Sequence, residues 1–255
     1  RTLQFTSAGL AAATSGAITI TPGAATQLTM VQQPSASAQN GISFPQQPTV
    51  QLRDISGNAV SAVVPVTVAI ATGGGTLGGT TVVNTSGAGL ATFSNLSITG
   101  LTGSRTLQFT SAGLTTATST AINITAGAAT QLVMVQQPSA TAANGAVFAQ
   151  QPTVQVRDAS GNNVSGVRSV AVALVGGGVL GGTTPVNTDA NGLATFAGLS
   201  ITGTIGSRTL QFTSAGLTGA TSTAINITAG AATQLVMVQQ PSATAANGAV
   251  FAQQP

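Results

Sequence analysis

The decapeptide RTLQFTSAGL occupies residues 1–10, recurs unchanged at residues 105–114 and appears a third time at residues 208–217. Apolar and polar side chains alternate along the middle of this stretch. Such alternation over a short run is typical of a β-strand with one buried and one exposed face. The decapeptide therefore predicts a half-buried strand, and its recurrence predicts one such strand in each of several repeats.

The rest of the chain repeats with the decapeptide. The three copies begin at residues 1, 105 and 208, which gives spacings of 104 and 103 residues. Residues 127–152 recur residue for residue at 230–255. The one-residue difference between the two spacings falls between Asp54 and Gly73. We expect this extra residue to be a loop insertion or an insertion at the end of a strand.

The phase of the repeat predicts four segments. Residues 23–126 and 127–229 each form one full repeat. Residues 1–22 form the C-terminal part of a preceding repeat, and residues 230–255 form the N-terminal part of a following one. The simplest interpretation is that the natural polypeptide continues in both directions.

Within a repeat, short alternating runs are bounded by Gly, Pro, Asn, Asp and Ser, and no helical period is sustained. In the second repeat the inward positions would include Val154, Val156, Leu210 and Phe212, with Gln155 among the outward ones. The strands predicted for this repeat are 131–136, 146–148, 153–157, 169–175, 184–187, 193–201, 208–213 and 224–228. This number of short strands in about 100 residues predicts a β-sandwich of the immunoglobulin type.

Three motifs carry a resemblance to a known family: AATQLVMVQQP at 128–138, QPTVQVRDASGN at 151–162 and NGLATF at 191–196. In this order they resemble bacterial immunoglobulin-like repeats of the invasin and intimin type, which occur in tandem in large surface proteins. The resemblance covers essentially the whole chain. It implies an all-β fold of tandem immunoglobulin-like β-sandwich domains arranged end to end, in a stalk or fibre at the cell surface.

The composition excludes several classes of function. Charged residues make up 4% of the chain, as six Arg and three Asp that give a net charge of +3. Six dispersed Arg form no basic patch, so we expect no nucleic-acid partner. They also lack the clustering that electrostatic binding to a membrane needs. No apolar run approaches the roughly 20 residues that span a bilayer, so we expect no direct membrane insertion in this stretch.

The chain also lacks the residues that catalysis needs. It contains no His, Cys, Lys, Glu or Tyr, and its only acids are Asp54, Asp158 and Asp189. No base, thiol or paired nucleophile can be assembled from this set. We therefore expect no catalytic residues, no cofactor-binding residues and no metal ligands, and the chain is predicted not to be an enzyme and to use no cofactor.

Three motifs admit a second interpretation. Residues 73–78 and 176–181 match G-x-G-x-x-G, but no helix is predicted after them, which favours an inter-strand loop. Residues 53–58 and 157–162, with the pattern RD-x-SGN, suggest calcium loops, yet one Asp each favours hairpin turns in which Asp binds its own backbone. Residues 189–192 are likewise predicted to be a hairpin connection.

The sequence therefore predicts a structural component of an extracellular fibre, stalk or filament. Its expected partner is itself, through a homo-oligomeric filament or lateral association, because a surface with so little charge lacks the repulsion that keeps proteins apart. The alternative is an adhesin stalk or binding module that recognises a glycan or a protein on a host or neighbouring cell. Either function places the chain outside the cell or at its surface.

Overall fold

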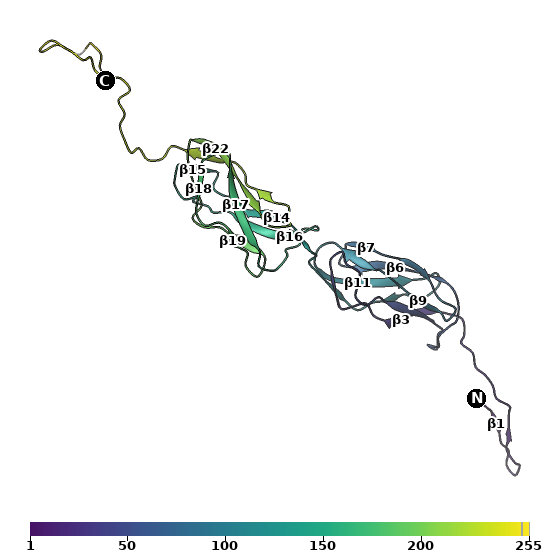
Figure 1. Cartoon of the computed structure of the whole chain (residues 1–255). Coiled ribbons are helices and arrows are strands. Elements are labelled where there is room, and N and C mark those ends of the chain that lie inside the picture. The colour runs from purple at the N-terminus through teal and green to yellow at the C-terminus, as the bar shows by residue number, and fades with distance from the viewer. Residues whose placement is uncertain (251, 255) are drawn as a thin grey trace. The chain divides into compact units, whose positions relative to one another are not determined.

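The computed structural model describes residues 1–250 and 252–254, and these form strands, turns and extended segments without a helix (Figure 1). The predicted all-β fold is confirmed. Accordingly, no helix long and apolar enough to cross a membrane occurs among those residues. The chain divides into two compact units. The first comprises Arg1–Thr130 together with Arg157–Val164, and the second comprises Gln131–Val156 and the chain from Ser165 onward.

Two sheets make up the sandwich that follows residue 22. One sheet has the strand order β3-β5-β9, and the other has the order β4-β13-β11-β6-β8, with β4 and β13 parallel. The strands are β3 (Gln27–Gln32), β4 (Ser37–Gln39), β5 (Thr49–Arg53), β6 (Pro65–Thr72), β7 (Thr76–Gly78), β8 (Val82–Asn84), β9 (Leu90–Thr92), β10 (Ser97–Thr99), β11 (Gly103–Thr110), β12 (Ala117–Thr118) and β13 (Ile122–Thr125). Strand β12 pairs with β11, and β7 pairs with β10.

The second repeat has the same topology, with strand orders β14-β16-β20 and β15-β24-β22-β17-β19. Its strands are β14 (Ala129–Gln136), β15 (Thr141–Ala143), β16 (Thr153–Asp158), β17 (Ser169–Val175), β18 (Val179–Gly181), β19 (Val186–Asn187), β20 (Leu193–Thr195), β21 (Ser200–Thr202), β22 (Gly206–Thr213), β23 (Ala220–Thr221) and β24 (Ile225–Thr228). Two packed sheets of short strands, with a parallel pair at one edge, form an immunoglobulin-type sandwich in each repeat.

Each repeat has its own apolar core between the two sheets. In the first, Phe93 follows β9 and packs against Phe109 of β11, with ring centroids 5.2 Å apart. The equivalent pair in the second repeat, Phe196 and Phe212, has centroids 5.1 Å apart. All four rings are fully buried. The sequence prediction that Leu210 and Phe212 point inward is confirmed.

The two ends of the chain are simpler. Residues 1–22 form one hairpin, in which β1 (Gln4–Phe5) pairs with β2 (Ala13–Thr14) in the same register as β11 with β12. The described residues after 229 form no strand. Residues 251 and 255 of the predicted following repeat lie outside the described residues. The repeat boundaries at 22, 126 and 229 stay a prediction.

Several predicted strands differ from the observed ones. Residues 146–148 form no strand, and the edge strand is instead β15, which ends just before the Asn144–Gly145 turn. The single strand predicted at 193–201 is two strands, β20 and β21, in different sheets. The extended conformation is interrupted between these two strands near Gly198, which has a φ of 69°. Two short strands, β18 and β23, were not predicted, because strands of two or three residues leave no alternating pattern.

The prediction that Gln155 points outward into solvent is wrong. Val154, Gln155 and Val156 are all buried, so both faces of the strand are covered at this point. The amide nitrogen of Gln155 donates to the carbonyl oxygens of Val156 and Asn191, at 3.2 and 2.9 Å. The hairpin at 189–192 therefore covers this side chain, and satisfied hydrogen bonds make the burial of a neutral amide tolerable.

The extra residue of the first repeat is Ala71, near the end of β6. Thr106 pairs with Thr72 and Leu107 pairs with Ile70, so Ala71 has no opposite residue on β11. The equivalent pairing of β17 with β22 is regular. The insertion is a β-bulge at a strand end, as the sequence predicted.

Candidate functional site

The most densely hydrogen-bonded side chain of the candidate site is Asp158, at the end of β16. It begins the turn 158–162, and its Oδ1 accepts from the backbone N–H groups of Ser160 and Asn162, at 2.9 and 2.8 Å. Gly161 takes a φ of 84°, which closes the turn. Asp54 forms the same bonds with Ser56 and Asn58. Both RD-x-SGN motifs are therefore turns of the predicted kind.

The other carboxylate oxygen of Asp158 binds residues distant in sequence. Its Oδ2 accepts from the backbone N–H of Gly127 at 2.8 Å, from Nδ2 of Asn40 at 3.0 Å and from Nδ2 of Asn162 at 2.9 Å. The Asn40 amide also donates to Oγ of Ser160, at 2.9 Å. These groups belong to the first compact unit. Asp158 thus ties the turn 158–162 to the loop after β4 and to the connection after β13.

Asn162 adds a second pair of bonds to the same unit. Its Nδ2 donates to the carbonyl oxygen of Gly100 at 2.9 Å, and its Oδ1 accepts from the N–H of Thr102 at 2.8 Å. Gly100 in turn donates its N–H to Oδ1 of Asn40, at 2.8 Å. Asn40, Asp158 and Asn162 are all buried. We call Asn40, Asp158, Ser160 and Asn162 the Asn–Asp clasp.

The clasp holds Asp158 in its charged form. Burial of this carboxylate raises its pKa, but the hydrogen bonds from Asn162, Gly127 and Asn40 outweigh that effect and lower the pKa from 3.8 to about 2. For Asp54, the amide of Asn58 is the main cause of a lowered pKa, also about 2. Both carboxylates are acceptors for N–H donors, and neither is poised to transfer a proton near neutral pH.

A calcium ion does not fit this site. The two oxygens of a carboxylate offer about four lone-pair positions, and N–H donors already occupy those of Asp158. Calcium requires about six to eight oxygen ligands. Throughout residues 1–250 and 252–254, no three acidic, His or Cys residues gather into a group that could hold a metal. The turn is a structural joint.

The clasp predicts how stability depends on pH. Because the pKa of Asp158 is lower in the folded state than its ordinary 3.8, its stabilisation is complete above roughly pH 5 and is lost as the pH falls through about 2. At neutral pH it contributes about 2 kcal/mol to the free energy of unfolding. We expect Asp158→Asn to remove this contribution and to flatten the curve between pH 5 and 2, as measured by urea denaturation at a series of pH values.

Asp54→Asn is the matched control. It removes the same carboxylate from the same kind of turn but leaves the bonds from Asn40 in place. In this variant we expect the part of the unfolding free energy that depends on Asp158 still to be lost as the pH falls from 5 to 2. An Asp158→Asn chain with an unchanged pH curve would contradict the assignment of Asp158 as a charged acceptor.

The glycine-rich stretches have a structural role of their own. Arg105 is buried, and its guanidinium donates to the carbonyl oxygens of Gly74, Ser104 and Leu101, at 2.8, 2.9 and 2.6 Å. Arg208 makes the same set of bonds in the second repeat, starting with the carbonyl oxygen of Gly177. Strand β7, not a helix, follows the first of these loops. The interpretation of G-x-G-x-x-G as an inter-strand loop is confirmed for residues 73–75, which connect β6 to β7. The last three residues of the motif form β7 itself, which was not predicted.

The third Asp also lies in a turn. Oδ1 of Asp189 accepts from the N–H groups of Asn191 and Leu193, at 2.8 and 2.9 Å. Oγ of Ser86 accepts from the equivalent groups in the first repeat, at 3.3 Å each. The predicted hairpin connection is confirmed, and the exchange of Asp for Ser preserves its bonding.

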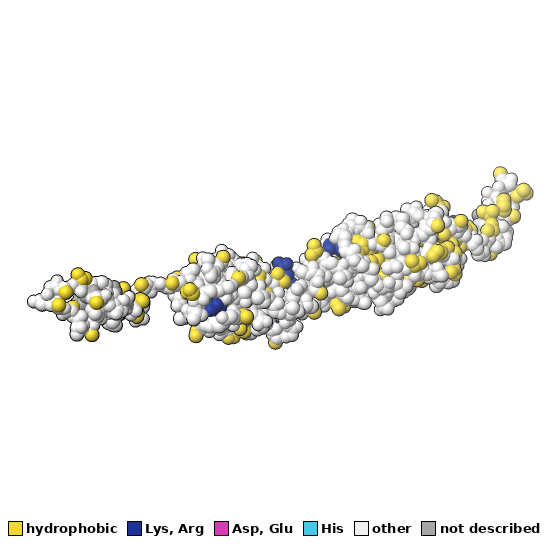
Figure 2. Space-filling view, turned by 90° about the horizontal axis from the view of Figure 1, so that it is seen from above, with side chains coloured by type: hydrophobic (Ala, Val, Ile, Leu, Met, Phe, Trp, Pro, Cys, Tyr) yellow, Lys and Arg dark blue, Asp and Glu magenta, His cyan; other side chains and the backbone are white. Residues whose placement is uncertain are grey.

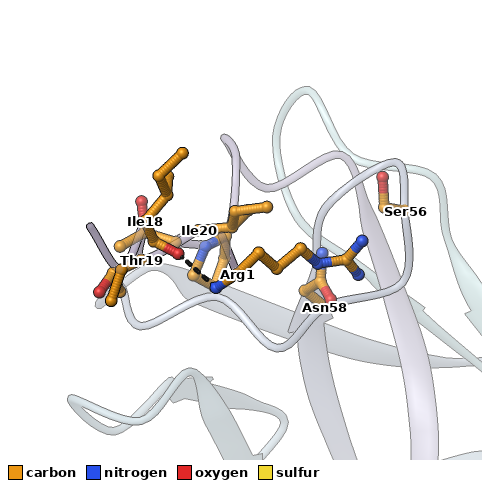
Figure 3. A pocket seen from close by; sticks show the side chains of 9 residues that line it. Arg1, Ile18, Thr19, Ile20, Ser56 and Asn58 are labelled. Carbon is orange, nitrogen blue, oxygen red and sulfur yellow. Dashed lines mark hydrogen bonds between the residues drawn. The ribbon is translucent and has the colours of Figure 1, made fainter. Parts of the chain in front are cut away.

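A cavity of about 740 Å³ lies between residues 17–22 and the Asp54 turn. Figure 3 shows the side chain of Arg1 extending past Ile20 toward Asn58, while the Arg1 amino group donates to the carbonyl oxygen of Ile18 at 2.8 Å. The cavity offers one guanidinium and no second titratable side chain, so it does not resemble a catalytic pocket.

The sequence did not reveal the Asn–Asp clasp. Asp158 was singled out for its turn, but Asn40 and Asn162 were not predicted to contact anything. A signal was present, because Asn40 recurs as Asn144 and Asn162 corresponds to Asn58. Asn recurring at a repeat position outside any strand indicates a specific hydrogen bond or a turn.

No family model matches the chain, and a search of curated proteins finds no match. Solved structures do align with it. One is FdeC, an Escherichia coli adhesin, at 19% identity and a TM-score of 0.37, covering 85% of this chain and 68% of that one. The D00-D0 domain of intimin aligns at 12% identity and a TM-score of 0.40, covering 79% and 98%. Both are bacterial immunoglobulin-like structures.

A β-glycosidase from Bacteroides vulgatus aligns as well, at 12% identity and a TM-score of 0.36. This alignment covers 78% of the present chain and 25% of the glycosidase. At these identities and scores, the alignments carry no activity, ligand or partner over to this chain. The fold assignment rests on the strand order and register of each repeat.

Proposed function

We propose that the chain is a structural segment of an extracellular fibre, stalk or filament, built from tandem repeats bounded at 23–126 and 127–229, and that it associates with copies of itself. The observation that carries the proposal is the Asn–Asp clasp. The most densely bonded polar group of the site is used to hold segments of chain together, and its acceptor positions are filled by N–H donors of the same chain.

The connection between successive repeats supports this function. Strand β13 ends at Thr125 and β14 begins at Ala129, so only residues 126–128 lie between them. The middle residue of the three, Gly127, donates its N–H to Asp158. A connection this short and hydrogen-bonded differs from the Gly/Ser-rich linkers that let domains move independently. It suits a segment whose task is to extend or space other parts of a protein.

The surface supports association between chains. Val31 and Val135 occupy equivalent positions on β3 and β14, and each is 56% exposed. Both strands lie at a sheet edge. Lys residues commonly protect exposed edges from pairing with other chains, and this sequence contains none. On the face that Figure 2 shows, basic side chains appear only at isolated points.

We expect the chain to self-associate as its concentration rises, and we expect the edge valines to contribute. The double variant Val31→Lys/Val135→Lys places a charge on each edge, which should weaken association at least about tenfold by repulsion between edges. Sedimentation velocity over a concentration series measures the effect. Val63→Lys/Val167→Lys is the control, because it adds the same two charges at equivalent positions that are 65% and 68% exposed and lie outside the strands.

Two results would count against the proposal. A wild-type chain that stays monomeric at high concentration contradicts self-association. A monomeric chain that binds specific sugars on a glycan array would instead favour the adhesin or binding module. If the two double variants weaken association equally, the effect comes from net charge and not from the edge strands.

A further inference from the structure

Asn144 stands in the second repeat where Asn40 stands in the first, and the protein holds the two in the same way. The N–H of Asn40 donates to the carbonyl oxygen of Thr125 at 2.9 Å, and the N–H of Asn144 donates to that of Thr228 at the same distance. Oδ1 of Asn144 accepts from the N–H of Gly203 at 2.8 Å, just as Oδ1 of Asn40 accepts from Gly100. Both side chains are therefore fixed with the amide nitrogen directed away from these bonds.

The two amide nitrogens differ in what they meet. Nδ2 of Asn40 has two acceptors, Oδ2 of Asp158 and Oγ of Ser160, and the residue is buried. Asn144 is exposed, and among residues 1–250 and 252–254 its Nδ2 has no acceptor. Asn144 therefore presents an oriented amide N–H donor without an acceptor, which is one half of an Asn–Asp clasp.

The neighbouring backbone completes this half-site. The Gly100 carbonyl and the Thr102 N–H, which bind Asn162, correspond to the Gly203 carbonyl and the Ile205 N–H. No side chain in the described part of the sequence bonds to this second pair. Thr102 and Ile205 differ in side chain, but each offers the same backbone donor. The half-site is therefore independent of that substitution.

The Asp54 turn shows that the complementary half forms without a partner. Asp54 accepts from Ser56, Asn58 and Gly23 as Asp158 does from Ser160, Asn162 and Gly127. No Asn plays the part of Asn40 for it among the residues that the structure places. Asn58 is exposed, whereas its counterpart Asn162 is buried. The turn is thus already folded, with an amide side chain ready to bind a carbonyl and an N–H.

We propose that Asn144, the Gly203 carbonyl and the Ile205 N–H form a docking site for the Asp-x-Ser-Gly-Asn turn of another copy of this repeat. The inference rests on the proposed function as a tandem array, and it identifies the groups through which one repeat would receive the next. A neutral amide meeting a carboxylate makes a charge-assisted hydrogen bond without a competing charge. The docking site is specific for the turn and not for an exposed apolar surface.

The test lengthens the protein by a second copy of residues 153–229, appended after residue 255, so that a complete repeat follows Asn144. The side-chain amide of Asn144 is observed by ¹⁵N NMR and assigned by its loss in Asn144→Ala. In the lengthened chain we expect its N–H exchange to slow at least tenfold and to approach that of Asn40. An appended repeat that folds and leaves the exchange of Asn144 unchanged overturns the proposal.

Asn144→Asp provides the specificity control, because it sets a carboxylate against the carboxylate of the docking turn. In the lengthened chain with this substitution, we expect the added repeat no longer to slow the N–H exchange of Gly203. Asn226→Asp adds the same charge at an exposed position of β24, and in that variant the added repeat should still slow the exchange of Gly203. Equal effects of the two substitutions would overturn the proposal.

If the appended repeat fails to fold, mixing two variants of the 255-residue chain decides the question. Labelled Asp54→Asn keeps the docking site and alters the turn, and unlabelled Asn144→Ala does the reverse. A saturable shift of the Asn144 amide supports docking, and no shift at about 1 mM, the effective concentration that a short connection supplies, overturns it. Lateral association is read separately, by sedimentation of Asn144→Ala, which lacks the docking amide, so the two proposals fail independently.

Discussion

Replacing Phe109 with alanine is expected to lower the free energy of unfolding of the first repeat by about 3 to 5 kcal/mol, the usual cost of removing a fully buried aromatic ring. The ring is fully buried and packs against Phe93, which contributes from the opposite sheet. Its removal opens a cavity at the centre of the sandwich. Hydrogen exchange read by mass spectrometry should show lost protection in 23–126 and unchanged protection in 131–156 and 165–229.

The repeat supplies two matched variants for this experiment. Phe212→Ala removes the equivalent ring from the second repeat and should transfer the loss of protection there. Phe5 occupies the same position in residues 1–22, where it is 61% exposed, so Phe5→Ala should change the stability by no more than about 0.5 kcal/mol. Equal losses for Phe5 and Phe109 would show that the effect comes from the strand sequence and not from burial.

Gly89→Ala is expected to destabilise the first repeat by about 2 to 5 kcal/mol. Gly89 has a φ of 76°, where a residue with a Cβ is strained by roughly 1 to 2 kcal/mol. A Cβ at this position would also overlap the carbonyl oxygen of Val60 and approach Nε2 of Gln51 to 2.9 Å. Neither the backbone nor the buried amide can move freely, so overpacking adds about 1 to 3 kcal/mol. Thermal unfolding followed by circular dichroism measures the loss.

Gly87→Ala, two residues earlier in the same turn, is the control. No atom lies within 4 Å of a Cβ built there, and the backbone is not in the left-handed region. This variant should be neutral or slightly stabilising, because alanine restricts the unfolded chain. A loss as large as that of Gly89→Ala would contradict the explanation of the Gly89 effect by its backbone angle and its close contacts.

The sequence predicted the central strands well because their pattern arises from burial. Val154 and Val156 of β16 and Leu210 and Phe212 of β22 are buried where alternation placed them. The short edge strands were missed or misplaced. Strand β15 has the sequence TAA, which carries no alternation, and its pairing with β24 depends on the packing of the whole sandwich. Tertiary context decides such strands, and local pattern does not.

The Asn–Asp clasp could be predicted only in part. The turn at Asp158 follows from local chemistry, because Asp and Gly at these spacings fix their own backbone. The contact with Asn40 joins residues 118 positions apart. No periodicity encodes such a contact, and neutral amides carry no charge pattern that would reveal a partner. Gln155 is the same kind of case, since its burial depends on a hairpin more than 30 residues later in the chain.

Strands β11 and β22 share the sequence GSRTLQFT, yet β11 pairs with a bulged β6 and β22 with a regular β17. The bulge therefore belongs to β6, and either octapeptide fits either partner. When the complete chain refolds from denaturant, the two strands compete for both positions, and exchanged pairings become kinetic traps. Synthesis from the N-terminus removes the competition from β22, because β11 emerges before β22 and can close the first sandwich before β22 exists. The order of synthesis thus decides which strand pairs with β6, although the sequences of the two strands are identical.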